Sequence, residues 1–181
     1  MLRPGGLVLL IESDLTPVVA VDGKAVALSR DETKLNGWFT LWRVYRECLR
    51  RRGIDISVPQ RLSELLTATQ AFENVVTHGA HIPVGFWPKG KVLCRLSSKS
   101  YNLSSKDEHQ LTAGQLQWLN YDLFIPALKP FFLSMDVPES NVDRTLKDAQ
   151  RDLYYPSTPY FALIHIVYAL KRKKGYVTHS R

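Results

Sequence analysis

Two stretches of the chain are apolar at consecutive positions rather than at every second one. Leu7 to Ile11 is an unbroken apolar run that follows a Pro-Gly-Gly turn, and Tyr160 to Leu170 is largely apolar on both strand faces. Such strands are typical of a sheet that is covered on both sides, as in parallel α/β proteins. We therefore predict three strands: Leu7–Ser13 and Tyr160–Leu170, both buried, and Phe72–Val84, which is extended but less apolar.

Helical periodicity begins at Gly37. Apolar side chains recur at spacings of three and four up to Leu49, with basic side chains on the other side, and Gly53 suits the C-terminal cap. A shorter helix is predicted to open at Pro59, since the first helical turn tolerates proline. Leu15–Asn36 has no sustained pattern, and we expect an irregular connection there.

The segment 86–159 has a different character and is predicted to be mainly helical. The helices expected in it are Val92–Tyr101, Leu111–Leu133 and Pro138–Leu153. Pro126 and Pro130 should kink or divide the second of them.

The resulting order is strand, loop, two helices, strand, helical segment, strand. The last strand is not preceded by a packed crossover helix, so we expect it to pair antiparallel with Phe72–Val84. We predict one partial α/β domain over residues 1–181, with residues 86–159 inserted as a helical cap. The first strand needs neighbours on both sides and nothing precedes it, so the chain is expected to be the back half of a larger domain.

The charge balance is basic, with 24 Lys and Arg residues against 17 Asp and Glu residues. The positive residues are scattered, and the run Arg50–Arg52 lies at a helix end that favours cations, so we do not expect nucleic acid as a partner. The two cysteines, Cys48 and Cys94, fit a reducing interior. We find no signal peptide and no span of membrane length, and we expect an intracellular protein (cytoplasm or nucleus) without a membrane partner.

Several common catalytic motifs are missing from the sequence. It has neither a G-x-S-x-G elbow nor a P-loop. His78 and His81 lack Cys, Asp or Glu at ligand spacing, so no metal is expected, and His165 suits a hydrogen-bonded sheet residue better than a catalyst. Glu12 and Asp14 stand out because the carboxyl ends of strands in doubly wound sheets face the ligand crevice.

An ordered set of segments resembles class I S-adenosylmethionine-dependent methyltransferases. Leu2-Arg3-Pro4-Gly5-Gly6 resembles the L-x-P-G-G turn before the fifth strand of that fold. Gly37-Trp38, Arg52-Gly53-Ile54-Asp55, the segment 59–66 and the segment 82–89 are similar to fungal methyltransferases related to the velvet-associated regulator of secondary metabolism. The resemblance implies the last three strands of a Rossmann-like sheet, with the final strand inserted antiparallel between the other two.

The resemblance also implies S-adenosylmethionine as the cofactor of full-length members and methyl transfer to an acceptor that the sequence does not identify. In the family, a glycine-rich turn after the first strand and an acidic residue after the second hold the cofactor, and neither has a counterpart here. Gln70-Ala71-Phe72 also replaces the usual glycine before the sixth strand. We therefore expect no cofactor on this chain alone, and no turnover.

Two groups of side chains are candidates for binding the acceptor. Glu12 and Asp14 would act as a base or hydrogen-bond acceptor, or else cap the loop after the strand. The aromatic candidates, each of which would serve equally in packing, are Trp38, Trp42, Trp87, Tyr101, Trp118 and Tyr121. The alternative function is a non-catalytic interaction fragment or pseudoenzyme, in which the open edge of Leu7–Ser13 pairs with a protein partner or a second copy.

Overall fold

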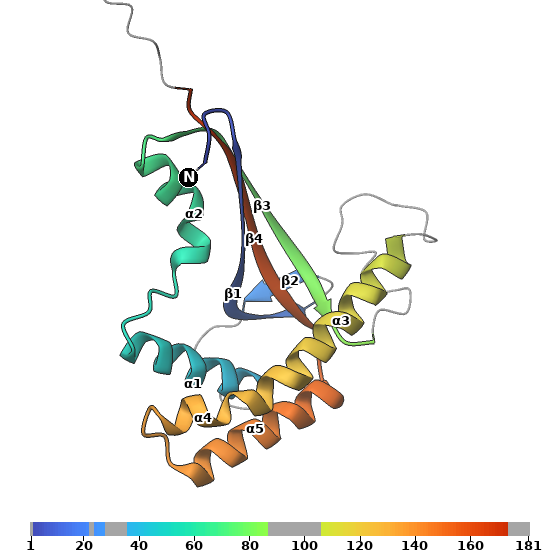
Figure 1. The fold of residues 1–181 in the computed structure, drawn as a ribbon. Coiled ribbons are helices and arrows are strands. Elements are labelled where there is room, and N and C mark those ends of the chain that lie inside the picture. The colour runs from blue at the N-terminus through green and yellow to red at the C-terminus, as the bar shows by residue number, and fades with distance from the viewer. Residues whose placement is uncertain (1, 22–23, 28–35, 87–105, 174–181) are drawn as a thin grey trace, which may run out of the picture. The chain divides into compact units, whose positions relative to one another are not determined.

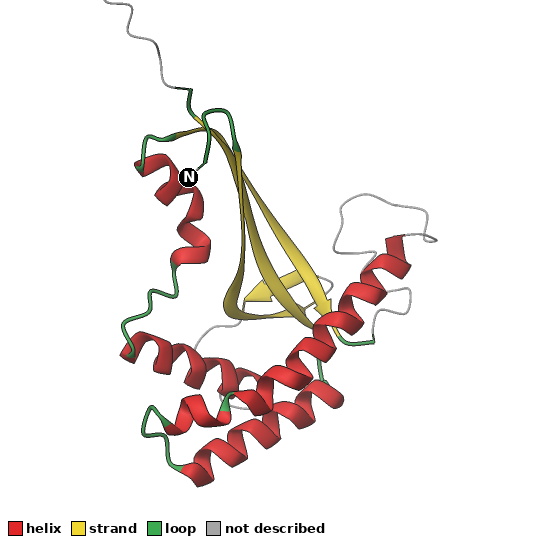
Figure 2. Ribbon diagram, viewed as in Figure 1, coloured by secondary structure: helices red, strands yellow, loops and turns green. Residues whose placement is uncertain are grey.

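The computed structural model describes residues 2–21, 24–27, 36–86 and 106–173, and shows an α/β protein (Figures 1 and 2). Its elements in chain order are β1 (Leu7–Val21), β2 (Lys24–Ala27), α1 (Gly37–Arg51), α2 (Val58–Ala68), β3 (Phe72–Val84), α3 (Lys106–Ala127), α4 (Lys129–Leu133), α5 (Glu139–Tyr154) and β4 (Tyr160–Lys171). The helix predicted over Val92–Tyr101 lies outside the described residues.

The four strands form one sheet in the order β2-β1-β4-β3. At one end of β4, the N–H of Gly5 donates to the carbonyl of Lys171 (2.8 Å), and the N–H of Lys171 donates to the carbonyl of Gly6 (2.9 Å). On the other side, the N–H of Arg172 donates to the carbonyl of Ala71 (2.9 Å). β4 therefore runs antiparallel between β1 and β3, and the predicted pairing of the last strand with Phe72–Val84 is confirmed.

β1 departs from its prediction in length and in pairing. It continues past Ser13 to Val21 and then turns back into β2, pairing antiparallel from Val18↔Ala27 to Val21↔Lys24. The expectation of an irregular connection over Leu15–Asn36 is thus wrong for its first part, because Val18 and Val19 are buried and the backbone of Val18–Val21 is paired. The expectation of a parallel sheet around this strand is also wrong, since both of its described neighbours are antiparallel.

The chain divides into two compact units. The first, here called the sheet unit, spans Met1–Ser13, Ser57–Ala80 and Ile164–Arg181, and the second, the helical unit, spans Asp14–Ile56 and His81–Leu163. Each has a separate apolar core. That residues 86–159 form a cap within a single domain stays a prediction.

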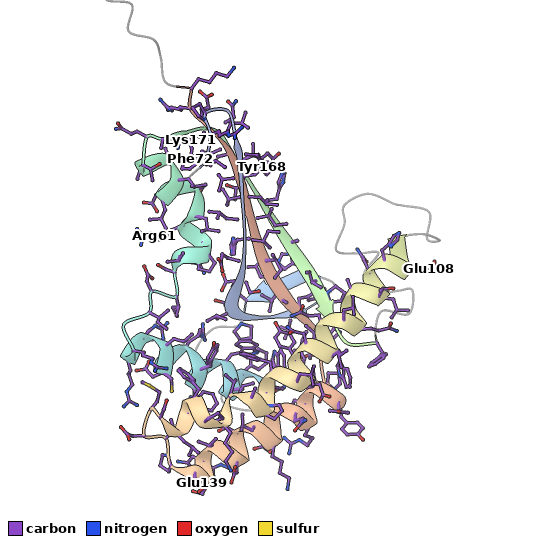
Figure 3. All side chains as sticks on the ribbon, in the orientation of Figure 1. Arg61, Phe72, Glu108, Glu139, Tyr168 and Lys171 are labelled. Atoms are coloured by element: carbon purple, nitrogen blue, oxygen red, sulfur yellow. The ribbon has the colours of Figure 1, made fainter. Side chains whose placement is uncertain are left out.

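In the sheet unit, α2 covers one face of the strands. Leu62 and Leu66 of α2 pack with Val167 and Ala169 of β4, and the half-buried Val8, Leu10, Phe72 and Val75 join them. Phe72, at the start of β3, and Lys171, at the end of β4, are labelled in Figure 3. The side chain of Arg172 donates to the carbonyl of Phe72 (3.0 Å).

The other face of β1 is uncovered among the described residues. Leu7, Leu9 and Ile11 are 58%, 53% and 59% exposed, whereas Val8 and Leu10, between them, point toward the α2 core. The prediction that this strand is buried on both faces is therefore wrong for the described structure. An apolar run indicates that a strand favours cover, but it does not say which segment supplies that cover.

In the helical unit, α1 is the centre of the core. Trp38 and Leu41 are 1% and 0% exposed. The helix begins after Asn36, whose side chain accepts from the N–H of Trp38, and it ends before Gly53, which has a φ of 79° that glycine adopts without strain. The predicted helix and its C-terminal glycine are confirmed.

α3 and α4 replace the single helix predicted over Leu111–Leu133. The break falls at Leu128, between Pro126 inside α3 and Pro130 in the first turn of α4, as expected for residues that lack a backbone N–H. α5 matches its prediction closely, and its apolar stripe of Val142, Leu146, Ala149 and Leu153 is buried. Within the described ranges, no helix combines the length and apolar character needed to cross a bilayer.

Candidate functional site

An aromatic cluster surrounds Trp38 and gathers three of the predicted acceptor-binding residues. The ring of Trp38 stacks on Tyr160 at 5.1 Å between centroids, and it meets Trp42 and Tyr121 edge-on at 5.6 Å and 5.0 Å. Trp42 and Tyr121 also contact each other edge-on at 5.5 Å. Such geometries are favoured by the ring quadrupoles, so this cluster (Trp38, Trp42, Tyr121 and Tyr160) is well packed.

A small cavity borders this cluster and adds a fourth predicted residue, Asp14. It has a volume of about 10 Å³ and is lined by Asp14, Leu15, Thr16, Pro17, Trp38, Trp42, Tyr121, Phe161 and Ala162. A cavity of this size holds at most about one water molecule. An organic methyl acceptor does not fit it, so the cluster serves here as core packing with a water-sized void.

Two polar groups beside this cavity differ in their hydrogen bonding. The indole N–H of Trp38 is buried and has no hydrogen-bond acceptor among the described residues, which is costly for an apolar core. The carboxylate of Asp14 accepts a hydrogen bond from the backbone N–H of Thr16 (2.8 Å), the local turn interaction that the sequence left open as its alternative role.

Burial raises the pKa of Tyr121 to about 12, and the hydrogen bond with Gln117 opposes that rise only in part. The Tyr121 hydroxyl therefore stays protonated at neutral pH and serves as a hydrogen-bonding group rather than as a base. Burial likewise raises the pKa of Cys48, which lies on the buried side of α1 and so is not an activated thiol.

The remaining predicted residues do not join this site. The indole N–H of Trp118 donates to the carbonyl of Leu153 (3.2 Å), and its ring packs edge-on against Phe86 and Tyr154. These contacts are the packing role that the sequence allowed as the alternative to acceptor binding. Glu12 is exposed and belongs to the sheet unit. Trp87 and Tyr101 lie outside the described residues.

Two of the three histidines considered in the sequence analysis contact an aromatic ring, and the third lies within a strand. His78 stacks on Tyr168 at 5.9 Å in the sheet unit, and His81 meets Phe161 edge-on at 6.2 Å in the helical unit. His165 is half-buried within β4. Among the residues that the structure describes, no group of three or more His, Cys, Asp or Glu side chains could hold a metal ion.

A second, polar cleft lies where the first turn of α1 meets α5, and sequence reasoning missed it. It has a volume of about 230 Å³ and is lined by Asn36, Gly37, Thr40, Arg144, Thr145, Asp148 and Arg151. The four α5 residues recur at helical spacing, but only the packing of α5 against α1 makes their face into a cleft. Gly37 permits that packing, because a Cβ there would stand 2.4 Å from the carbonyl carbon of Asp148.

Polar groups of the N-cap residue Asn36, of α5 and of β4 form hydrogen bonds at the first turn of α1. The N–H of Trp38 donates to the side chain of Asn36 (2.8 Å) and to the carboxylate of Asp152 (3.2 Å). The amide of Asn36 in turn donates to the hydroxyl of Tyr160 (2.6 Å). Burial raises the pKa of Tyr160, the hydrogen bond from Asn36 lowers it, and the negative charge of Asp152 raises it further. These contacts tie the cleft to the aromatic cluster.

Comparisons of the chain with protein-family models, with curated proteins and with solved structures found nothing that matches it.

Proposed function

We propose that this chain is the acceptor-side portion of an S-adenosylmethionine-dependent methyltransferase, and that it works with a complementary half that binds the cofactor. The observation that carries the proposal is the position of β4, antiparallel between β1 and β3. The helices α3, α4 and α5 lie in sequence between β3 and β4, where the resembling branch also has its helical insertion.

The open side of β1 supports the need for a complementary half. β2 pairs with β1 over Val18–Val21, so within the described ranges no strand lies beside Leu7–Ser13 on that side. The adjacent face of the same segment exposes Leu7, Leu9 and Ile11. A partner that supplies one strand would satisfy the edge, and a helix would cover the face. The occupant that supplies both is an α/β unit, such as the first half of a methyltransferase domain.

Three of the described glycines are already used by the fold itself. Gly5 has a φ of 77° and bonds to the end of β4, Gly37 is pressed against Asp148, and Gly114 approaches the carbonyl of Gly85. Each of these glycines meets a need of the fold, and none opens a backbone surface toward a ligand. S-adenosylmethionine would therefore be held by the complementary half.

The proposed contribution of this chain is the surface that positions the acceptor. Methyl transfer depends chiefly on holding acceptor and cofactor close and in line, rather than on one universal catalytic group. Asp14 is the polar candidate that lies beside the aromatic candidates, and because the void between them is too small for an acceptor, binding there would require the neighbouring side chains to move apart. Its carboxylate would accept a hydrogen bond from the acceptor. A change of Asp14→Asn would then raise the KM for the acceptor more than it lowers kcat.

The experiment measures binding of radiolabelled S-adenosylmethionine to the purified chain and to the native species immunoprecipitated from its own cells. The proposal predicts micromolar binding by the native species and none by the chain alone. Two results contradict it: micromolar binding by the isolated chain, or a native species that fails to bind the cofactor.

A second candidate function is a non-catalytic interaction protein that pairs through β1 with a second copy. The exposed row of Leu7, Leu9 and Ile11 favours it, because an apolar row beside an open edge promotes association. Sedimentation velocity separates the two candidates. A reversible dimer that Leu9→Lys abolishes would support this function, whereas a monomer at all concentrations would exclude it.

A further inference from the structure

We propose that the outer face of α3 docks against the same helix of a second copy of this chain. The surface involved is the leucine stripe (Leu116, Leu119 and Leu123), which lies in the helical unit. This contact does not depend on the proposed methyltransferase function. It also differs from association through Leu7–Ser13 of β1, because it uses another surface in the other unit.

The leucine stripe is exposed although its spacing is that of a helix-packing surface. Leu116, Leu119 and Leu123 are 62%, 47% and 67% exposed. Their separations of three and four residues place them on one face of α3, and this spacing is typical of the seam along which two helices pack. The opposite face of α3 is already in use, because Tyr121 and Ile125 are buried in the core of the helical unit. α3 is therefore apolar on both sides.

The outer face of α3 also lacks the charges that normally solvate a surface helix. Over residues 109–127, Asp122 is the only Asp, Glu, Lys or Arg in the sequence. Its half-buried carboxylate accepts hydrogen bonds from Gln150 (3.2 Å) and Tyr154 (3.0 Å) of α5, so it is engaged with α5 rather than with the stripe. The exposed positions of α5, in contrast, are mostly charged, which is the usual pattern. The stripe is thus an apolar surface without a charged border.

The symmetry of the stripe favours a second copy as the occupant. The stripe extends three residues to one side of Leu119 and four residues to the other, so it is nearly the same in both directions along the helix. In an antiparallel pair related by a two-fold axis, Leu119 would face Leu119 of the second copy, and Leu116 would face Leu123. A two-fold interface requires such a self-complementary surface.

Charge decides between the antiparallel and the parallel arrangement of the two helices. Glu108, labelled in Figure 3, is exposed in the first turn of α3. A parallel pair would bring together the two Glu108 carboxylates and the two positive ends of the helix dipoles, and both contacts are unfavourable. An antiparallel pair separates the glutamates and places each helix dipole favourably against the other. The uncharged stripe of one copy then meets the uncharged stripe of the other.

The small area of the stripe sets the expected strength of the contact. Three leucines and their immediate neighbours cover less than the roughly 800 Å² that each partner contributes to a standard stable interface. We therefore expect a weak, reversible dimer with a Kd of about 10–100 µM.

The test is sedimentation velocity of the full chain at concentrations from about 5 to 500 µM. A reversible shift from monomer to dimer is expected. Leu119→Lys should raise the Kd by about tenfold or more, because two lysines would face each other at the two-fold axis. The matched control is Leu65→Lys, which makes the same change at a leucine of α2 that is 40% exposed and should leave the Kd unchanged.

Disulfide cross-linking tests the geometry of the same contact. Leu119→Cys should give a covalent dimer under mild oxidation, since the two copies of this residue meet at the axis. Leu65→Cys should not, and the unsubstituted chain controls for its two native cysteines.

Three results would overturn the proposed dimer. The first is a monomer at every concentration, which would leave the stripe to another occupant. The second is a dimer that Leu119→Lys leaves intact but Leu9→Lys abolishes, which would assign the association to β1. The third is a dimer that Leu65→Lys weakens as much as Leu119→Lys does.

Discussion

The helical unit and the sheet unit use the same kinds of apolar side chains but differ in how fully they cover them. Leu41, in α1, is 0% exposed and belongs to the core of the helical unit, whereas Leu9, in β1, is 53% exposed. The helical unit closes its core with its own helices. The sheet unit covers one face with α2, whereas Leu7, Leu9 and Ile11 on the other face of the segment Leu7–Ser13 are exposed among the described residues.

The largest effect is expected at Leu41. Leu41→Ala should lower the free energy of unfolding by about 2–5 kcal/mol, because it leaves a cavity in a closed core. Urea denaturation measures this loss. A loss below about 1 kcal/mol would show that the helical core is looser than its packing indicates.

Alkaline pH provides the second test of the closed core. The pKa of Tyr121 is raised to about 12 from its ordinary 10.0, so its contribution to stability is complete below pH 10 and is lost as the pH rises toward 12. The unfolding free energy should fall by about 2–3 kcal/mol across this interval on account of this residue. Tyr121→Phe should make the pH dependence shallower, and an unchanged profile would argue against a buried hydroxyl.

A somewhat smaller effect is expected where α1 meets α5. Gly37→Ala would place a Cβ 2.4 Å from the backbone of Asp148, and the resulting displacement should cost about 1–3 kcal/mol. Gly79→Ala is the matched control, because nothing lies within 4 Å of its Cβ position. Equal stabilities of the two variants in thermal denaturation would contradict the close approach of these helices.

The smallest effect on stability is expected at the open face. Leu9→Ser should change the unfolding free energy of the chain by no more than about 0.5 kcal/mol, because the side chain is already half exposed. The same substitution should strongly reduce association through β1, measured by light scattering against concentration. A large loss of stability without a change in association would mean that Leu9 belongs to a closed core.

The sequence predicted the elements whose pattern is set locally. The stripe of α1 with its glycine end, the division of α3 and α4 near two prolines, and the buried row of α5 all follow from spacing and backbone chemistry. The length of β1 and the elements that cover its two faces could not be predicted in this way. An apolar run indicates that a strand favours burial, but it does not indicate which segment packs against it.

The candidate site, too, could be predicted only in part from the sequence. Trp38, Trp42 and Tyr121 do come together with Asp14, but they do so in a core whose void admits only about one water molecule. The polar cleft escaped prediction because Thr145 and Gly37 are far apart in sequence and ordinary in isolation. The one local signal was the spacing of polar residues along α5, which is shared by many solvent-facing helices.

The most direct test of the account is native mass spectrometry of the protein isolated from its own cells, combined with hydrogen exchange over Leu7–Ser13. The account predicts a mass well above that of this chain, contributed by a covalently linked or bound α/β half. It also predicts slow exchange along β1 that becomes fast when that half is removed. A species with the mass of this chain alone and fast exchange over Leu7–Ser13 would contradict it.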